Sequence, residues 1–384
     1  MEIKILHILN DDKFIDRHIS NIQKGDFQNT FVYLKEEFTY TGSSLQLLKH
    51  VKPYSLAFDD LINDCQNYHV LILYYLSKDK ADIVNKLKKK KPIIIWSFYG
   101  GDLYSLPEIK TGLFSPGTLN VLNISTKKTP FLYIKDFLCP LYKIFSKNSA
   151  SIAAIRKAIS RIDYFAWYNK EEYEFLNERF KNKLPVFLKS SIATPFNLIH
   201  GTSEKLGSIL IGNSASPYNN HIDIIQELDK LNYSGKITIP FSYGSQHYIT
   251  RIKELVKSSK LHISFLESFF PYQDYISLMN EHTCAIFNSY RQMALGNIFI
   301  ALKCGVKVYL SSKNPSYQWL KKKGFFIYSI ENDLTRHVKE NNLRLSEEYA
   351  KLNIFTCNKI GDGNANKRFL YELKRIVEEH TTIH

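Results

Sequence analysis

The sequence predicts an α/β protein built from two parallel-sheet domains. Short apolar, β-favouring runs alternate along the whole chain with segments of helical periodicity, which is typical of repeated strand-helix-strand units. At 384 residues the chain is also longer than one hydrophobic core usually organises. We therefore expect two domains of roughly 190 residues each.

Composition and net charge limit the classes of protein to which the chain can belong. A hydrophobic fraction of 44% with 14% aromatic residues excludes a disordered or fibrous chain. The net charge of +14 implies an anionic partner, which charge alone leaves open among nucleic acid, an anionic bilayer and a phosphorylated substrate. The five cysteines are widely spaced without a CxxC pair, so we expect reduced core thiols of a cytosolic protein. No stretch reaches the roughly 20 apolar residues of a membrane span, and the first residues do not form a signal peptide.

The first half alternates strands and helices. Strands are expected at Glu2–Leu9, Thr30–Leu34, Val70–Tyr75, Pro92–Trp96 and Ile162–Tyr168, and helices at Phe14–Gln23, Lys78–Lys91 and Lys170–Phe180. The first strand runs into Asn10 and Asp12. These two are either site residues at the carboxyl end of the sheet or ordinary turn and cap residues.

The loop after the fourth strand holds Tyr99, Gly100, Gly101 and Asp102. Two adjacent glycines permit close approach of a ligand to the backbone. Asp102 is open to two interpretations, a general base for an acceptor hydroxyl or a cap of the next helix.

Residues 128–160 interleave aromatic side chains with lysine and arginine. An amphipathic helix of this composition can lie in a membrane headgroup interface, although the same spacing also describes a core helix. The stretch therefore leaves a peripheral membrane contact open.

The segment Pro185–Ser208 lacks periodicity and contains several breakers. It divides the chain into an N-terminal domain, 1–195, and a C-terminal domain, 196–384, whose last helix is free to pack back on the first domain; the family resemblance given below implies that the first is the acceptor-side domain and the second the donor-binding domain. Strands of the second domain are expected at 209–211, Ile237–Pro240, His282–Asn288, Val306–Leu310 and Phe325–Tyr328, and helices at His221–Leu231 and Lys367–Glu379.

Three strand ends in the second domain run into small and polar residues. Gly212, Asn213 and Ser214 follow the first, Phe241 to Gly244 the second, and Asn288 closes the third. In open α/β sheets ligands sit at this edge, where helix starts present unpaired N–H groups to anions.

The run 212–225 (GNSASPYNNHIDII), the run 239–252 (IPFSYGSQHYITRI), residues 271–320 and the motif 99–104 (YGGDLY) share their order and approximate spacing with one family. The chain resembles the bacterial TDP-4-acetamido-4,6-dideoxygalactose (Fuc4NAc) transferases, also called 4-α-L-fucosyltransferases. These enzymes act on lipid-linked enterobacterial common antigen intermediates. Together with the two α/β halves, the resemblance implies a GT-B fold, with two Rossmann-like domains facing a central cleft.

The resemblance also implies roles for individual residues. Donor-binding residues would be Gly212, Asn213, Ser214, Tyr243, Gly244, Tyr272, Asn288, Arg291, Gln292, Leu295, Gly296 and Asn297. Asp102 would be the catalytic carboxylate, with Asn10, Asp12, Tyr99, Gly100 and Gly101 on the acceptor side. The turn 294–297 reads Ala-Leu-Gly-Asn where the family has a Gly-Ile-Gly-Thr-like turn, which leaves the sugar and the nucleotide open.

No P-loop, no GxGxxG after the first strand and no convincing DxD pair is present. We therefore expect no cofactor and no metal, with the diphosphate neutralised by backbone N–H groups and cations. The expected activity is transfer of a deoxyamino or fucose-like sugar from a nucleoside diphosphate, TDP favoured, to a polyprenyl-diphosphate-linked oligosaccharide. The enzyme would be cytoplasmic and peripheral at the inner face of the bacterial inner membrane, in O-antigen or enterobacterial common antigen assembly.

Two alternatives stay open. One is another GT-B transferase for lipopolysaccharide that uses GDP-fucose or a UDP-sugar. The other is a basic, non-catalytic membrane- or nucleic-acid-binding protein. Its nucleic-acid form is disfavoured because no DNA- or RNA-reading motif is present.

Overall fold

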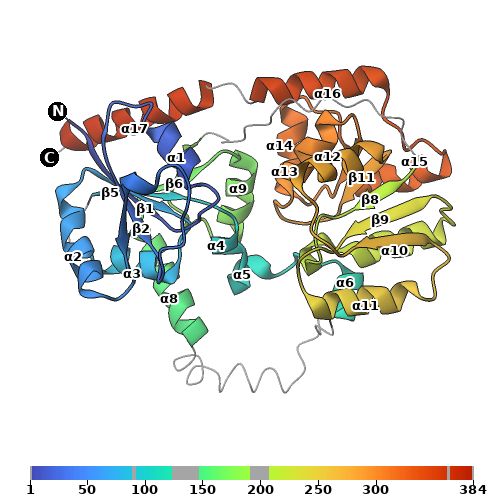
Figure 1. The fold of residues 1–384 in the computed structure, drawn as a ribbon, viewed down its shortest axis with the longest axis horizontal. Coiled ribbons are helices and arrows are strands. Elements are labelled where there is room, and N and C mark those ends of the chain that lie inside the picture. The colour runs from blue at the N-terminus through green and yellow to red at the C-terminus, as the bar shows by residue number, and fades with distance from the viewer. Residues whose placement is uncertain (1, 89–91, 123–146, 191–206, 361–363, 383–384) are drawn as a thin grey trace. The chain divides into compact units, whose positions relative to one another are not determined.

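The computed structural model describes residues 2–88, 92–122, 147–190, 207–360 and 364–382 (Figure 1). The chain forms two compact units, which we describe separately. Unit 1 falls within Met1–Lys110, Thr129–Ala193 and Gly363–His384, and unit 2 within Thr111–Lys128 and Thr194–Asp362.

This division departs from a single boundary at 195/196 at two places. Ser115 and its neighbours group with unit 2, because Ser115 N donates to Asn220 Oδ1 (2.9 Å) and Gly117 N donates to Asp223 Oδ1 (3.1 Å). The last helix groups with unit 1 instead, as the sequence left open.

Unit 1 is a seven-stranded parallel sheet in the order β3-β2-β1-β4-β5-β6-β7. Its strands are β1 Lys4–Leu9, β2 Gln28–Leu34, β3 Leu48–Val51, β4 Val70–Tyr74, β5 Ile93–Ser97, β6 Tyr164–Trp167 and β7 Val186–Lys189. All five residues of β4 are buried, as expected for a parallel strand covered by helices on both faces. The sequence did not predict β3 and β7, which are four-residue strands without a clear apolar run.

The described helices of unit 1 are α1 Ile15–Ile22, α2 Leu56–Asp64, α3 Lys78–Lys86, α4 Gly101–Tyr104, α5 Pro107–Lys110, α8 Lys147–Ile159, α9 Lys170–Arg179 and α17 Asn364–Thr382, with 3₁₀ turns at Leu45–Leu47 and Cys65–Asn67. Helix α3 ends five residues before the predicted Lys91, because the backbone turns to an extended conformation at Leu87. Leu373, Ile376 and Val377 of α17 belong to the same apolar core as Ile15, Ile19 and Ile22 of α1. The two helices lie close together in Figure 1.

Unit 2 is a six-stranded parallel sheet in the order β10-β9-β8-β11-β12-β13. Its strands are β8 Ile209–Ile211, β9 Lys236–Pro240, β10 His262–Leu266, β11 Cys284–Phe287, β12 Lys307–Leu310 and β13 Tyr328–Ser329. Its described helices are α6 Pro116–Val121, α10 His221–Lys230, α11 Gln246–Val256, α12 Tyr272–Glu281, α13 Leu295–Lys303, α14 Pro315–Lys322, α15 Thr335–Lys339 and α16 Glu347–Ile360, with a 3₁₀ turn at Pro217–Asn219 and a π-helical turn at Ile330–Leu334. The sequence missed β10, an edge strand whose residues are all exposed or half-buried.

Each sheet reverses its direction of growth at one place. In unit 1 the reversal lies between β1 and β4, and in unit 2 between β8 and β11. In doubly wound sheets the loops on either side of this reversal diverge and leave a crevice at the carboxyl ends of the strands. Ligand-binding residues are therefore expected in the loops after β1, β4, β8 and β11.

The structure bears on two expectations from composition, the state of the cysteines and the presence of membrane segments. Cys65, Cys284, Cys304 and Cys357 are buried and form no disulfide, which confirms for these four that they are core thiols. Most of the aromatic, basic stretch 128–160 lies outside the described residues, and within the described ranges no helix is long and apolar enough to cross a membrane.

Candidate active site

Gly212 begins the loop that leaves β8 in unit 2. Its φ of +70° belongs to the left-handed region, and a Cβ at this position would collide with His221 Nε2. Only glycine therefore allows the chain to turn from β8 towards α10. The turn buries Asn213 and Ser214 against the sheet end.

Asn220 and Asn288 tie together the two loops at the reversal of the sheet. Asn220 Nδ2 donates to the carbonyl oxygen of Asn288 (3.0 Å), and Asn288 Nδ2 donates to that of Asn220 (3.1 Å). The side chain of Asn288 is thus a structural clamp between β8 and β11, which differs from its expected role against a nucleobase. Asn288 itself is only 4% exposed.

Tyr243 and Gly244 bring the loop after β9 beside the loop after β8. Ala215 N donates to the carbonyl oxygen of Tyr243 (2.8 Å), and Asn213 Nδ2 donates to the Tyr243 hydroxyl (3.1 Å). Gly244 has a φ of +132°, and a Cβ there would overlap the backbone of Ala215. The Tyr243 ring nevertheless stays 59% exposed, so it can contact a ligand.

Three buried polar atoms gather around this loop without a hydrogen-bond partner in the described structure. They are Asn213 Oδ1, Asn219 Oδ1 and His221 Nε2. The other ring nitrogen, His221 Nδ1, lies 3.2 Å from the Tyr248 hydroxyl, and burial lowers the pKa of His221 to about 3. Unpaired buried polar atoms are rare and costly, so these three atoms make the loop a candidate site for a polar ligand. Asn219 and His221 were not among the predicted site residues, although the Asn-Asn-His run before a helix is a signal in the sequence that could have indicated them.

Arg291 follows β11 and reaches the loop after β8. Its guanidinium lies over the ring of Tyr218 at 4.6 Å, and Tyr218 stacks in turn on Phe114 at 4.7 Å. Ser289 Oγ and Asn314 Nδ2 donate to the Arg291 carbonyl oxygen at 2.9 and 2.8 Å. Neighbouring residues therefore contact both the guanidinium and the backbone of Arg291.

Helix α13 begins at Leu295, where the sequence placed a helix start. Ala294 before it has a φ of +58°, an unusual conformation for a residue with a side chain. A Cβ on Gly296 would meet no atom within 4 Å, so the space beside the first turn is open. Gln292, Leu295 and Asn297 flank this start and are half-buried.

Tyr272 lies farther along the same edge. It is the first residue of α12, after the edge strand β10, and is 48% exposed. Its stacking on a base remains a prediction. Phe269 in the same loop, which the sequence analysis did not mention, is 82% exposed.

Asp102 in unit 1 is buried, with an exposed fraction of 2%. Its carboxylate accepts hydrogen bonds from Trp96 Nε1 (2.7 Å), Leu76 N (3.2 Å) and Tyr99 N (3.3 Å). Burial raises the pKa of Asp102 to about 6 despite these bonds. Both oxygens bind the loops after β4 and β5, an arrangement that suits a positioning role, and a catalytic role of Asp102 as general base stays a prediction.

The side-chain oxygens of Asn10 and Asp12 likewise accept hydrogen bonds from other side chains of unit 1. Asn10 Oδ1 accepts from Lys80 Nζ (2.8 Å), and Lys80, which also binds the carbonyl oxygen of Tyr74, is fully buried. Burial lowers the pKa of Lys80 to about 7. Asp12 accepts from Tyr33 and Thr39 and pairs with Lys35 (3.3 Å). Lys80 is thus a buried lysine within a helix, a feature that the helical pattern did not reveal.

Tyr99 stands at the carboxyl end of β5. Its hydroxyl hydrogen-bonds to His18, and its ring makes edge contacts with Phe14 and Tyr75 at 5.6 and 6.4 Å. Gly100 has a φ of +96°, which lets the chain turn directly into α4. The sequence predicts a loop over Tyr99, Gly100 and Gly101; in the structure Tyr99 and Gly100 precede α4 and Gly101 is its first residue.

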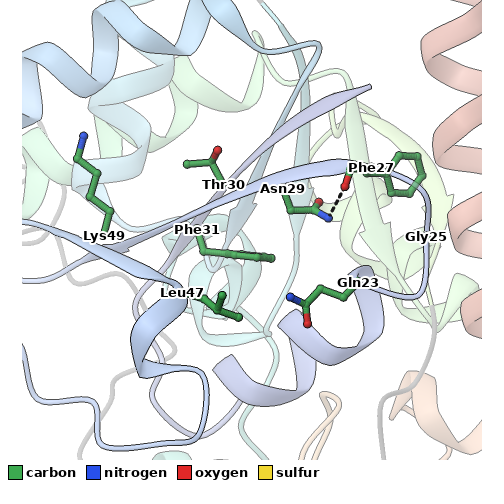
Figure 2. A pocket seen from close by; sticks show the side chains of 8 residues that line it. All are labelled: Gln23, Gly25, Phe27, Asn29, Thr30, Phe31, Leu47 and Lys49. Atoms are coloured by element: carbon green, nitrogen blue, oxygen red, sulfur yellow. Dashed lines mark hydrogen bonds between the residues drawn. The ribbon is translucent and has the colours of Figure 1, made fainter. Parts of the chain in front are cut away.

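A hollow of about 370 Å³ lies at the opposite, amino-terminal end of β2 and β3 (Figure 2). Phe31 and Leu47 line it with Asn29, whose Nδ2 donates to the Phe27 carbonyl oxygen (3.1 Å). Lys49 is the one ionisable group in its lining. Without a carboxylate or a pair of cations, this hollow offers little for sugar transfer.

Residues 156–359 match the family described as 4-alpha-L-fucosyltransferase, glycosyl transferase group 56. The matched stretch is more than half of the chain. The chain belongs to this family. The loops after β8, β9 and β11 all fall inside the match, whereas the Tyr99 to Asp102 loop precedes it.

Solved structures show the fold of this group 56 transferase. It is similar to Anabaena Alr3699/HepE crystallised with UDP and glucose, at 11% identity over 97% of this chain and 100% of that one, with a TM-score of 0.58. Sucrose-phosphate synthase from Thermosynechococcus elongatus matches at 9% identity over both complete chains (TM-score 0.60). A glycosyltransferase from Rickettsia africae matches at 12% identity over 98% of each chain (TM-score 0.59). The chain is a GT-B glycosyltransferase of the α/β class.

Proposed function

We propose that this enzyme transfers a deoxyamino or fucose-like sugar of the Fuc4NAc type to a polyprenyl-diphosphate-linked oligosaccharide. The donor is a nucleoside diphosphate sugar, with TDP favoured and GDP or UDP as the alternatives. The product enters surface polysaccharide assembly, as in O-antigen or enterobacterial common antigen. The observation that carries the proposal is the set of polar loops at the β8/β11 reversal of a fucosyltransferase-family chain.

Unit 2 binds the donor in this proposal. Arg291 supplies a cation, and the open first turn of α13 at Gly296 supplies backbone N–H groups for the diphosphate. Both stabilise the negative charge that develops on the leaving diphosphate, so no metal is required. Within the described ranges no three His, Cys, Asp or Glu side chains gather as a metal site, and metal independence stays a prediction.

The nucleoside lies along the loops after β9 and β10. Tyr243 offers an exposed ring beside Asn213, and Tyr272 offers a second exposed ring at the sheet edge. Aromatic faces of this kind stack on any base. That breadth is consistent with a nucleotide that the sequence leaves open, and a related fold has been crystallised with UDP.

In the reaction, an acceptor hydroxyl oxygen forms a bond to the anomeric carbon as the bond from that carbon to the diphosphate breaks. The hydroxyl proton passes to a base, and the nucleoside diphosphate leaves. Asp102 contributes by holding Tyr99 and the loop before α4 in place, since its oxygens are bonded to the protein.

A thermal-shift screen of the full chain tests this function. The melting temperature is measured with and without TDP, UDP and GDP. Binding of DNA and RNA is measured by filter binding on the same preparation. Stabilisation by one nucleoside diphosphate supports the transferase. Nucleic-acid binding without any nucleotide response would favour the basic, non-catalytic alternative and overturn the proposal.

A further inference from the structure

Arg17 lies in the first turn of α1, just after the loop that leaves β1. Its guanidinium forms no hydrogen bond or ion pair with any residue of the described ranges, and its Nη2 atom is buried. The neighbouring acid does not compensate it, because Asp16 accepts from Tyr40, Ser43 and Ser44. Arg17 is thus a half-buried cation without a carboxylate of its own.

A cation in this state is costly to the fold. Removing guanidinium N–H groups from water without supplying acceptors forfeits their hydration. Burial accordingly lowers the pKa of Arg17 to about 10. Folding alone gives no reason for the charge, since a neutral side chain at this position would avoid the cost.

The position of Arg17 in the fold gives a reason for a positive charge there. It lies at the β1/β4 reversal of the unit 1 sheet, the place where doubly wound sheets bind ligands. The adjacent residue, His18, hydrogen-bonds to the Tyr99 hydroxyl at the carboxyl end of β5. Buried Lys80 binds Asn10 at the end of β1, but burial lowers the pKa of Lys80 to about 7, so Arg17, unlike Lys80, is fully charged at neutral pH.

The acids at this edge are already engaged. Asp102 binds Trp96 and two backbone N–H groups, and Asp11 caps its own loop by accepting from Lys13 N (3.2 Å). These acids do not pair with Arg17, so an anion from outside the chain would supply the acceptor that its buried Nη2 atom lacks.

We propose that Arg17 forms an anion site in unit 1 that binds a phosphate group of the sugar acceptor. A guanidinium binds phosphate oxygens through two parallel N–H bonds, which an ammonium group cannot reproduce. This inference rests on the proposed function, in which the acceptor sugar is carried on a diphosphate. The same chemistry would suit a phospholipid headgroup, so the experiment separates the two sources.

The test is calorimetric titration of the full chain with inorganic diphosphate. The nucleotide site of unit 2 is first saturated with whichever of TDP, UDP or GDP stabilises the protein most. Arg17→Gln should weaken diphosphate binding by about tenfold or more, and Arg17→Lys by less. The matched control is Arg375→Gln on α17, which removes the same charge from an exposed arginine paired with Glu372 and Glu379 and should leave the affinity unchanged.

A second measurement distinguishes binding from folding. Because Arg17 has no partner to lose, Arg17→Gln should unfold at the same temperature as the wild type or a higher one. A marked fall in that temperature would show that Arg17 supports the fold, and would overturn the inference. Equal diphosphate affinity of Arg17→Gln and wild type, or no diphosphate binding beyond the nucleotide site, would also overturn it.

Vesicles identify the source of the phosphate. Arg17→Gln should sediment with phosphatidylglycerol vesicles as the wild type does, since the contact is to the acceptor. Loss of sedimentation without loss of diphosphate affinity would assign Arg17 to headgroups and refute the acceptor role. Absence of any nucleotide binding would instead count against the transferase function, while the diphosphate titration still tests Arg17.

Discussion

Asp102→Asn separates the two interpretations of this carboxylate. The wild-type oxygens accept from Trp96 Nε1, Leu76 N and Tyr99 N. An asparagine keeps one acceptor oxygen and turns an NH₂ group towards at least one of these donors. The unpaired buried donor should lower the free energy of unfolding by about 1–3 kcal/mol.

The pH dependence of this effect has a definite sign. Burial raises the pKa of Asp102 from 3.8 to about 6, so the folded state holds the proton more tightly than the unfolded state. The stability that Asp102 contributes is therefore fully present below about pH 4 and falls as the pH rises to about 6, by roughly 3 kcal/mol in all. Asparagine has no such dependence.

The assay is urea unfolding of both proteins at pH 4, 5, 6 and 7. The advantage of wild type over Asp102→Asn should shrink from pH 4 to pH 6 and then level off towards pH 7. Asp12→Asn is the control of opposite sign. Burial acts to raise the pKa of Asp12, but hydrogen bonds from Tyr33, Thr39 and Lys35 outweigh burial and lower it, so the wild-type advantage there should fall as the medium becomes more acid.

The positioning role would be refuted by a variant that keeps the wild-type stability and nucleotide affinity while its turnover drops by about 10² to 10⁴. That pattern is expected of a general base. It would return Asp102 to the catalytic role that the sequence suggested.

Three further predictions follow from other residues. Arg291→Ala should raise the dissociation constant of the nucleoside diphosphate about tenfold or more, and unchanged affinity by calorimetry would remove Arg291 from the site. Gly212→Ala should destabilise the protein by at least about 1–2 kcal/mol, since alanine is strained at a φ of +70° and meets His221; an unchanged urea midpoint would contradict this. Neutralising Lys135, Lys143 and Lys147 together should reduce co-sedimentation with anionic liposomes, each lysine near the surface being worth about 1 kcal/mol; equal sedimentation of the wild type on neutral and anionic vesicles would speak against the membrane contact.

The sequence was most informative where apolar runs were long. Val70–Tyr74 and Cys284–Phe287 are buried strands at the predicted places, because parallel strands covered on both faces need continuous apolar residues. It failed for the edge strands Leu48–Val51 and His262–Leu266, whose exposed side chains carry no such signal. Strand order, which decides where the loops meet, was beyond local patterns.

The chain by itself determined the α/β class, the family and the loops that hold Gly212, Tyr243, Arg291 and Tyr99, because short-range spacing and turn chemistry specify these features. Only the tertiary structure decided what each polar side chain faces. Asp102 is a buried carboxylate that binds Trp96, Lys80 is a buried lysine that binds Asn10, and Arg17 has a buried nitrogen without a partner. Burial and hydrogen-bond partners of this kind depend on how the elements pack together. A carboxylate or guanidinium has the same chemistry anywhere in the chain, and packing alone determines whether that chemistry is used by the fold or remains available to a ligand.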